Sequence, residues 1–310
     1  MTTPGMVFPG QGSQHQGMLE DFADNFPRIL HTYEEAADIL GFDLWRIQQE
    51  NPNDQLNQTE FTQPILLTAS VAIWRLLKRE AVSSPSMMAG HSLGEYSALV
   101  CADALSFADA LMLVRLRGQY MQAAVPEGEG AMAAILGLSL LEVNALCEAV
   151  ANGEVLAAAN INCPGQIVIA GSQVAVAAAC EQAKAHGAKL AKMLPVSVPS
   201  HCALMAPAAH ELAQALQDIS LRTPSIPVVQ NVDGKVTTEV TVIRDNLIQQ
   251  LTHPVQWVAC VETMLQAGCD VFVECGAGKV LTGLTKRISK SVACFSTEHA
   301  AAFAWTVQSI

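Results

Sequence analysis

Charged residues are scarce in this chain, and the sequence patterns that mark several protein classes are missing. Asp, Glu, Lys and Arg make up only 15% of the 310 residues, and the first Lys or Arg is Arg28. The start therefore lacks the basic region of a signal peptide. No uncharged apolar run approaches the roughly 18 residues that cross a bilayer. We expect a soluble, cytoplasmic protein without a membrane partner.

Cysteine pairs with metal-site or redox spacing are also missing. The nine cysteines are scattered, and none lies in a C-x-x-C pattern. Zinc sites and redox motifs normally show such pairs, so we interpret the cysteines as reduced, mostly buried thiols and expect no metal. The net charge of −12 argues against nucleic acid as a partner, because phosphates repel an acidic protein.

The 310 residues are enough for one large α/β domain with a smaller insertion or for two ordinary domains, and 51% of them are hydrophobic, which allows a large buried core. Over 128–196 the pattern predicts strand, helix, two strands, helix and strand, the βαββαβ order of a ferredoxin-like unit. We therefore predict an α/β fold. Residues 1–127 and 197–310 form an α/β-hydrolase-like core with a parallel sheet, and 128–196 form an inserted ferredoxin-like small subdomain.

The elements expected in the core follow from hydrophobic periodicity and turn residues. Strands are expected from Gly5 and near 86–90, 226–231 and 270–274, and helices near 18–40, 62–79, 94–101, 107–123, 203–217, 241–251, 256–267 and from 278.

The segment Gly90-His91-Ser92-Leu93-Gly94 matches the G-x-S-x-G pattern of a nucleophile elbow. The pattern alone is common, but here an apolar strand precedes it and a helix follows it. In that setting the serine hydroxyl is lifted out of the backbone, and the N–H groups at the start of the helix favour an oxyanion. We predict that Ser92 is a nucleophile.

A serine hydroxyl needs a base within hydrogen-bond reach. Of the eight histidines, His201 follows a strand end and a tight turn and precedes a helix. We therefore predict that His201 is the base. No acidic residue between 182 and 200 lies at a strand end, so the third member of a hydrolase triad is not evident. Either a distant carboxylate or a backbone or amide oxygen orients the imidazole.

Arg117 lies in an apolar helical segment, two residues from Arg115, so the two side chains face different sides. At least one of them must point into packed structure, where a guanidinium needs an anion. A structural ion pair and a clamp for a substrate carboxylate both remain open.

Two glycine-rich loops are incomplete as nucleotide sites. The loop containing Gln11 has His15 where a dinucleotide fingerprint has its third glycine, and Gly276–Lys279 lacks the Ser or Thr of a P-loop. We expect no nucleotide cofactor. Gln11 offers a further donor to an oxyanion.

Several blocks of the sequence, together with Arg117, resemble the bacterial malonyl-CoA:acyl carrier protein transacylases of type II fatty acid synthesis. The resemblance covers essentially the whole chain. The blocks are Phe8–Gln14, Gly90–Tyr96, Asn160–Gln166, Pro199–Cys202, Pro254–Trp257 and Gly276–Leu281.

This resemblance implies an acyltransferase in which malonyl-CoA acylates Ser92, with His201 as base and then acid. It implies that the backbone N–H groups of Gln11 and Leu93 form the oxyanion hole and that Arg117 pairs with the malonyl carboxylate. It further implies that the main-chain carbonyl of Gln250 orients the histidine. The implied partners are malonyl-CoA or CoA and an acyl carrier protein, with no cofactor.

Local clusters of basic residues stand out in this acidic chain, between Glu181 and Glu211 and between Glu274 and Glu298. We interpret them either as ordinary solvated faces or as a docking rim for an anionic partner. Acyl carrier proteins are acidic in the family, so the rim residues Lys189, Lys192, Lys286 and Arg287 become candidates for carrier docking.

Three alternatives stay open at this point. The chain is also compatible with an acyltransferase that loads a polyketide-type carrier, with a serine thioesterase or hydrolase, and with a carrier-docking module whose site is inactive.

Overall fold

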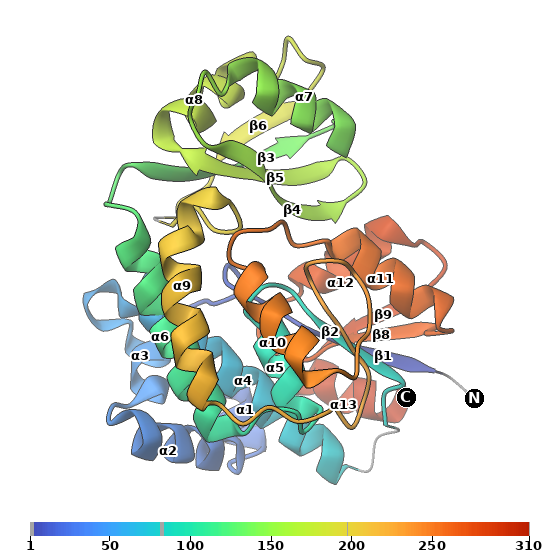
Figure 1. Cartoon of the computed structure of the whole chain (residues 1–310). Helices are drawn as coiled ribbons and strands as arrows, with labels where there is room; N and C mark the ends of the chain where they lie inside the picture. Colours follow the sequence, from blue (N-terminus) through green and yellow to red (C-terminus); the bar gives the residue numbers. More distant parts are fainter. Residues whose placement is uncertain (1–2, 81–83, 197, 310) are drawn as a thin grey trace.

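The structure is a computed structural model that describes residues 3–80, 84–196 and 198–309. Two separate sheets organise the chain, a larger one in the lower part of Figure 1 and a smaller one above it. Positions 1, 197 and 310, which bound the predicted core segments, lie outside the described residues.

The larger sheet contains five parallel strands in the order β7-β2-β1-β8-β9. These strands are β1 (Pro4–Phe8), β2 (Met87–Gly90), β7 (Val228–Val229), β8 (Val271–Glu274) and β9 (Ala293–Ser296). Parallel strands need crossover connections that cover the faces of the sheet, so their residues are apolar on both sides. The predicted α/β fold with a parallel sheet is confirmed.

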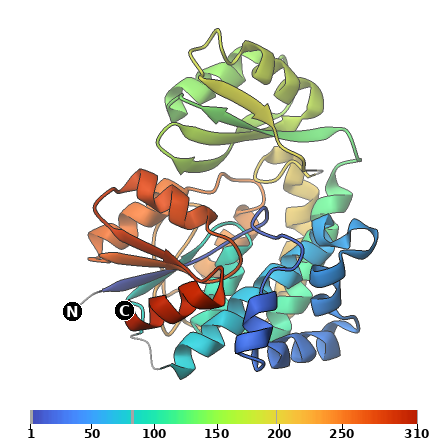
Figure 2. The same ribbon diagram turned by 180° about the vertical axis from the view of Figure 1, so that it is seen from behind.

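Helices cover both faces of this sheet. Val7, Ala89 and Phe272 pack under α11 (Trp257–Gln266) and α12 (Val280–Ile288), whereas Met6 and Met88 point into the core on the opposite face. Figure 2 shows the same layers from behind. The helices of this part are α1 (Glu20–Asn25), α2 (Ile29–Leu40), α3 (Leu44–Glu50), α4 (Thr59–Arg79), α5 (Gly94–Cys101), α6 (Phe107–Ala124), α9 (Ala206–Ala215), α10 (Val240–Gln249), α11 (Trp257–Gln266), α12 (Val280–Ile288) and α13 (Ala300–Ser309), with short 3₁₀ turns at η1 (Pro52–Asn57), η2 (Ala203–Met205) and η3 (Leu216–Asp218).

The smaller sheet is antiparallel, with the strand order β4-β5-β3-β6. Along the chain its elements are β3 (Gly130–Leu136), α7 (Leu140–Val150), β4 (Leu156–Cys163), β5 (Gln166–Ser172), α8 (Gln173–Gln182) and β6 (Leu190–Met193). This is the predicted βαββαβ order, and the strand arrangement is that of a ferredoxin-like unit. We propose 128–196 as the extent of this subdomain.

The smaller sheet is joined to the core along its edge strand β4. The N–H of Ile161 donates to the carbonyl of Val255 at 2.9 Å, and the N–H of Val255 donates to the carbonyl of Ala159 at 2.9 Å. A further hydrogen bond runs from Arg287 of α12 to Gln166 of β5. The helices α7 and α8 cover the outer face of this sheet, so its other face looks toward the core (Figure 1).

Some elements differ from the sequence-based expectations. The helical pattern near 18–40 is two helices, because Pro27 lacks an N–H and disfavours a helical residue before it. The helices α3 and α13 and the short edge strand β9 were not predicted. Within the described ranges, no helix combines the length and apolar character needed to cross a bilayer.

Candidate active site

The segment between β2 and α5 forms a sharp turn with Ser92 at its apex. Ser92 has a φ of 53°, in the left-handed region that a serine rarely adopts. Both flanking glycines are required by close backbone approach. A Cβ on Gly90 would lie 1.8 Å from the carbonyl carbon of Gly94, and one on Gly94 would lie 2.1 Å from the oxygen of Phe8. The geometry is that of a nucleophile elbow.

Asn231 holds this strained turn from the end of the neighbouring strand β7. Its Oδ1 accepts a hydrogen bond from the Ser92 N–H at 2.7 Å, and its Nδ2 donates to the Gly90 carbonyl at 2.7 Å. The Asn231 side chain is fully buried, so both bonds are protected from water. A backbone in an unfavourable conformation persists only where its surroundings fix it, and Asn231 supplies that restraint.

His201 lies directly beside the serine. Its Nε2 is 2.8 Å from the Ser92 Oγ, and its Nδ1 is 2.6 Å from the main-chain carbonyl of Gln250. A carbonyl oxygen accepts only, so Nδ1 carries the hydrogen and Nε2 is left free to accept the serine proton. The ring is therefore oriented by a backbone oxygen at the place where a triad has a carboxylate.

Arg117 projects from α6 to the same point. The helix can approach closely because Gly118 contacts the backbone of α4, where a Cβ would lie 2.7 Å from the Thr59 oxygen. The guanidinium is 1% exposed. It donates to amide oxygens of Gln63 at 2.8 Å and Gln250 at 2.9 Å, and to the Ser92 Oγ at 3.3 Å.

No carboxylate forms an ion pair with Arg117 in the described parts of the chain. Its Nε–H has no hydrogen-bond partner there either. The guanidinium also lies over the ring of Tyr96, 5.4 Å from its centroid. Arg115 stacks in the same way on the ring of Phe42, at 4.9 Å, on another side of α6. A buried guanidinium that meets only neutral oxygens and an aromatic ring is prepared for an anion, because an unpaired buried charge is costly.

Gln11 and Leu93 lie on the two sides of the serine. Both line the same cavity as Ser92, and neither backbone N–H donates to another described residue. The side chain of Gln11 is turned away and donates to Thr59 Oγ1 at 3.3 Å. Two free N–H groups beside a nucleophile can stabilise an oxyanion.

The cavity over the serine has a volume of about 120 Å³. The core contributes its floor, including Ser92 and His201, and the small subdomain contributes Met132, Asn160 and Leu194. The two parts are linked beside the cavity, where His91 Nε2 lies 2.8 Å from Asn162 Oδ1 of β4. The site is thus a small chamber, lined by both polar and apolar side chains, at the carboxyl ends of β1, β2 and β7, where ligands of open α/β sheets bind.

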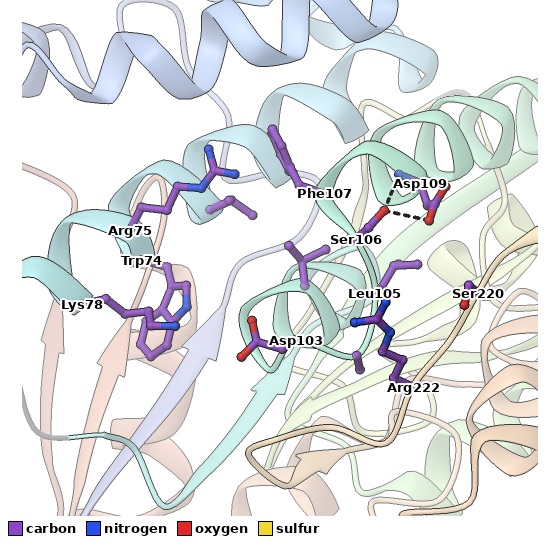
Figure 3. Close-up of a pocket in the computed structure, with 13 residues that line it drawn as sticks. Trp74, Arg75, Lys78, Asp103, Leu105, Ser106, Phe107, Asp109, Ser220 and Arg222 are labelled. Atoms are coloured by element: carbon purple, nitrogen blue, oxygen red, sulfur yellow. Dashed lines mark hydrogen bonds between the residues drawn. The ribbon is translucent and has the colours of Figure 1, made fainter.

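A larger hollow of about 360 Å³ lies elsewhere, between α4, α5 and α6. Figure 3 shows Trp74, Arg75 and Lys78 on one side of it and Arg222 on the other. Two serines line it, Ser106 and Ser220, but no histidine does. Ser106 donates to Asp109 and caps α6, so it is not an activated nucleophile. This hollow does not contain the serine–histidine pair.

Burial sets the charges in the site. It lowers the pKa of His201 to about 3, and the nearby charge of Arg117 lowers it further in the same direction. The imidazole is therefore neutral at physiological pH. Burial also lowers the pKa of Arg117 and raises that of Glu95 to about 7, against hydrogen bonds from Gln250 and Asn231.

The four candidate docking residues are exposed, but they fall into two groups. Lys286 and Arg287 lie in the last turn of α12, next to the β4–β5 turn. Lys189 and Lys192 lie at β6, the opposite edge of the four-stranded sheet. Lys192 pairs with Ala134 of β3, so it shares the sheet face of Met132 that looks toward the cavity.

Three polar residues of the site were not singled out from the sequence, namely Glu95, Asn231 and Gln63. Glu95 stands three residues after the serine in the elbow helix, and Asn231 ends a predicted strand. A polar residue at the carboxyl end of a parallel strand was the available signal for Asn231. Gln63 carries no such signal, because α4 is buried around most of its circumference.

We also searched the structure for groups of metal ligands and for paired or exposed cysteines. Within the described ranges, no group of three or more His, Cys, Asp or Glu side chains is placed to hold a metal ion. The cysteines are free, and all but Cys180 are buried.

A strained serine, a neutral histidine and two free N–H groups in a parallel α/β fold are the arrangement that acyl transfer by a serine nucleophile requires. Comparison with known proteins agrees with this class. The family model described as acyl transferase domain matches residues 6–302.

The chain is 53% identical over 304 residues to the malonyl CoA-acyl carrier protein transacylase of Escherichia coli (strain K12), covering 98% of both chains. It is 41% identical to that of Staphylococcus aureus (strain MRSA252), covering 94% of both chains. The structure of this transacylase from Coxiella burnetii matches with a TM-score of 0.97 and 48% identity, covering 99% of this chain and 97% of the other.

A further solved structure is that of a type II PKS acyl-carrier protein in complex with its malonyl-transacylase. It matches with a TM-score of 0.98 and 49% identity over the full length of both chains. The chain belongs to the acyl transferase family, among the malonyl CoA-acyl carrier protein transacylases.

The lowered pKa of His201 predicts how acylation depends on pH. A base with a pKa of about 3 is unprotonated at every pH above that value, so acidification to pH 5 leaves it active. A histidine with an ordinary pKa near 6.5 would lose about fifteenfold between pH 6.5 and 5. We expect kcat/KM for malonyl-CoA, followed by CoA release, to fall by less than about twofold over that range. A loss of tenfold or more would contradict the assignment of a neutral, buried base.

Proposed function

We propose that this chain transfers a malonyl group from malonyl-CoA to the pantetheine thiol of an acyl carrier protein, through an acyl-enzyme at Ser92. The activity supplies malonyl units for fatty acid synthesis. The choice of acyl group rests on the buried Arg117, which donates to the serine oxygen and contacts no carboxylate among the described residues. The family membership supports the same substrate and carrier.

In the first half-reaction the Ser92 Oγ attacks the thioester carbonyl of malonyl-CoA while His201 Nε2 accepts the hydroxyl proton. The oxygen of the tetrahedral intermediate takes up negative charge, which the N–H groups of Gln11 and Leu93 stabilise. The C–S bond then breaks, and His201 returns the proton to the sulfur of the leaving CoA. The Gln250 carbonyl holds the imidazolium in place between these two transfers.

The second half-reaction reverses these steps with a different thiol. His201 takes the proton from the pantetheine sulfhydryl, and the sulfur attacks the malonyl-serine ester. The C–O bond breaks and His201 returns the proton to Ser92. The enzyme returns to its starting protonation state, and no cofactor takes part.

Transfer to a thiol competes with hydrolysis by water. The chamber is small, and Met121, Met132 and Leu194 line it around the serine. A small enclosure with apolar side chains around the nucleophile positions a thiol that arrives on a pantetheine arm and leaves little room for free water. These features support transferase activity over the thioesterase or hydrolase alternative.

The polyketide-type carrier remains a second candidate acceptor. It is favoured by the match to a malonyl-transacylase in complex with a type II PKS acyl-carrier protein. The two candidates share the same chemistry at Ser92 and differ only in the surface that delivers the thiol. Comparing transfer rates to carriers of both classes at equal concentration separates them.

Carrier docking is proposed on α12 and β6. Lys286 and Arg287 lie on the core beside the β4–β5 turn, and Lys192 lies on the side of the small sheet that faces the cavity. Three strand spacings of about 4.8 Å separate β4 from β6, roughly 14 Å in all. A carrier domain of ordinary size can span that distance, so one acidic surface can meet both groups.

Replacement of Arg117 by alanine tests the proposed substrate. We expect Arg117→Ala to lower kcat/KM for malonyl-CoA by at least about 100-fold, because the malonyl carboxylate loses its buried partner. The same variant should gain activity on acetyl-CoA relative to malonyl-CoA. The matched control is Arg115→Ala, which removes a neighbouring arginine on another side of α6. An unchanged malonyl-to-acetyl ratio in Arg117→Ala would refute the carboxylate clamp.

Charge reversal on α12 tests the docking surface. Lys286→Glu is expected to raise KM for the carrier by about three- to tenfold at low salt while KM for malonyl-CoA stays the same. Lys78→Glu, an equal charge change at the far end of α4, serves as the control and should alter neither constant. If Lys286→Glu behaves like this control, α12 does not dock the carrier.

A further inference from the structure

A buried carboxyl group lies behind the reacting residues and takes no part in the mechanism above. Glu95 is 0% exposed and sits in α5, three residues after Ser92. Its Oε2 accepts hydrogen bonds from Gln250 Nε2 at 2.7 Å and from the Asn231 N–H at 3.1 Å. Its Oε1 has no partner in the described parts of the chain. One carboxyl oxygen is therefore held by two hydrogen bonds, and the other has none among the described residues.

Glu95 is connected to Arg117 through a single side chain. Because the Glu95 oxygen accepts the Gln250 Nε2, the amide oxygen of Gln250 must face the other way, where it accepts from Arg117 at 2.9 Å. Burial lowers the pKa of Arg117, and Tyr96 and then Glu95 act in the opposite direction. The pKa of Tyr96 is itself raised to about 12, so its phenol carries no charge near neutral pH. Of these two groups, Glu95 is therefore the one that can carry a negative charge near neutral pH and balance the guanidinium.

We propose that Glu95 exchanges a proton with solvent as the malonyl group comes and goes. Its carboxylate balances Arg117 while the site is empty, and it takes up a proton when the malonyl carboxylate becomes the partner of the guanidinium. This rests on the proposed role of Arg117 as the malonyl clamp. Glu95 is a positioning residue, because it touches Gln250 and Asn231 and not the substrate.

The surroundings of Glu95 make this exchange feasible near neutral pH. Burial raises its pKa to about 7, while the hydrogen bonds from Gln250 and Asn231 and the charge of Arg117 act in the opposite direction. Asp233, in the loop after β7, raises it further. Tyr96 on the same helix and Cys260 on α11 have pKa values raised by burial, so both are neutral.

A second negative charge at Arg117 disfavours the ionised form of Glu95 and raises its pKa. Linkage requires the converse: protonated Glu95 favours the malonyl group by the same factor. The preference for malonyl-CoA over acetyl-CoA should therefore fall as pH rises through about 7. The interaction between two charges in a partly polar interior corresponds to a change of about fivefold in this preference.

The experiment measures the ratio of kcat/KM for malonyl-CoA to that for acetyl-CoA between pH 5.5 and 8.5. Both substrates share the CoA moiety and the chemistry of His201, so those pH effects cancel in the ratio. In the native enzyme we expect the ratio to fall by about fivefold across pH 7. In Glu95→Gln the amide oxygen can keep both hydrogen bonds, so the ratio should stay at its high value and be independent of pH.

Glu274→Gln is the matched control. Glu274 is equally buried at the end of β8, its pKa is also raised to about 7 by burial, and it accepts from the N–H groups of Leu281 and Thr282. It does not contact Gln250 or Arg117, so this variant should keep the pH profile of the native enzyme.

A ratio that does not change with pH in the native enzyme, or that still changes in Glu95→Gln, overturns the proposal. Lack of any malonyl preference at every pH would instead refute the role of Arg117, so the two failures are distinguishable. If Glu95→Gln does not fold, the proposal is tested by proton uptake of the native enzyme. In a weakly buffered solution at pH 7.5, malonyl-CoA should cause more uptake per acyl-enzyme than acetyl-CoA, and equal uptake would overturn the proposal.

Discussion

Gln250 contacts Ser92, His201 and Arg117, and the geometry of the site depends on these contacts. Its main-chain carbonyl orients His201, its amide oxygen holds Arg117, and its amide nitrogen donates to the Ser92 carbonyl at 3.0 Å and to Glu95. The residue is completely buried at the end of α10. A buried amide with all its hydrogen-bonding groups engaged has one orientation only, so the base, the guanidinium and the elbow are fixed relative to one another.

The use of a carbonyl in place of a carboxylate has an electrostatic consequence. A buried aspartate beside His201 would stabilise the imidazolium strongly and would also repel an incoming malonyl carboxylate. A neutral carbonyl orients the ring without that repulsion. The negative charge that balances Arg117 is instead on Glu95, which is separated from the guanidinium by the Gln250 amide. There it can be neutralised by a proton. The chamber can therefore accept an anionic acyl group next to a general base.

The elbow, the parallel sheet and the inserted unit could be predicted from the sequence because each depends on local patterns. The Gly-x-Ser-x-Gly turn between an apolar strand and a helix is such a pattern, and so is the alternation of short strands and helices over 128–196. The strand β9 is only four residues long and lies at the edge of the sheet, so its sequence shows little alternation. The contact between Glu95 and Asn231 joins residues that are 136 positions apart, and no local pattern reports such closeness.

The central claim is that Ser92 carries malonyl from one thiol to another, and the mass of the isolated protein tests it most directly. After incubation with malonyl-CoA and removal of free nucleotide, we predict one malonyl group per chain, located on Ser92 by peptide mapping. Addition of holo acyl carrier protein should then return the enzyme to its original mass and move the malonyl group to the carrier. A malonyl group on another residue, or its release as free malonate without appearance on the carrier, would contradict the account.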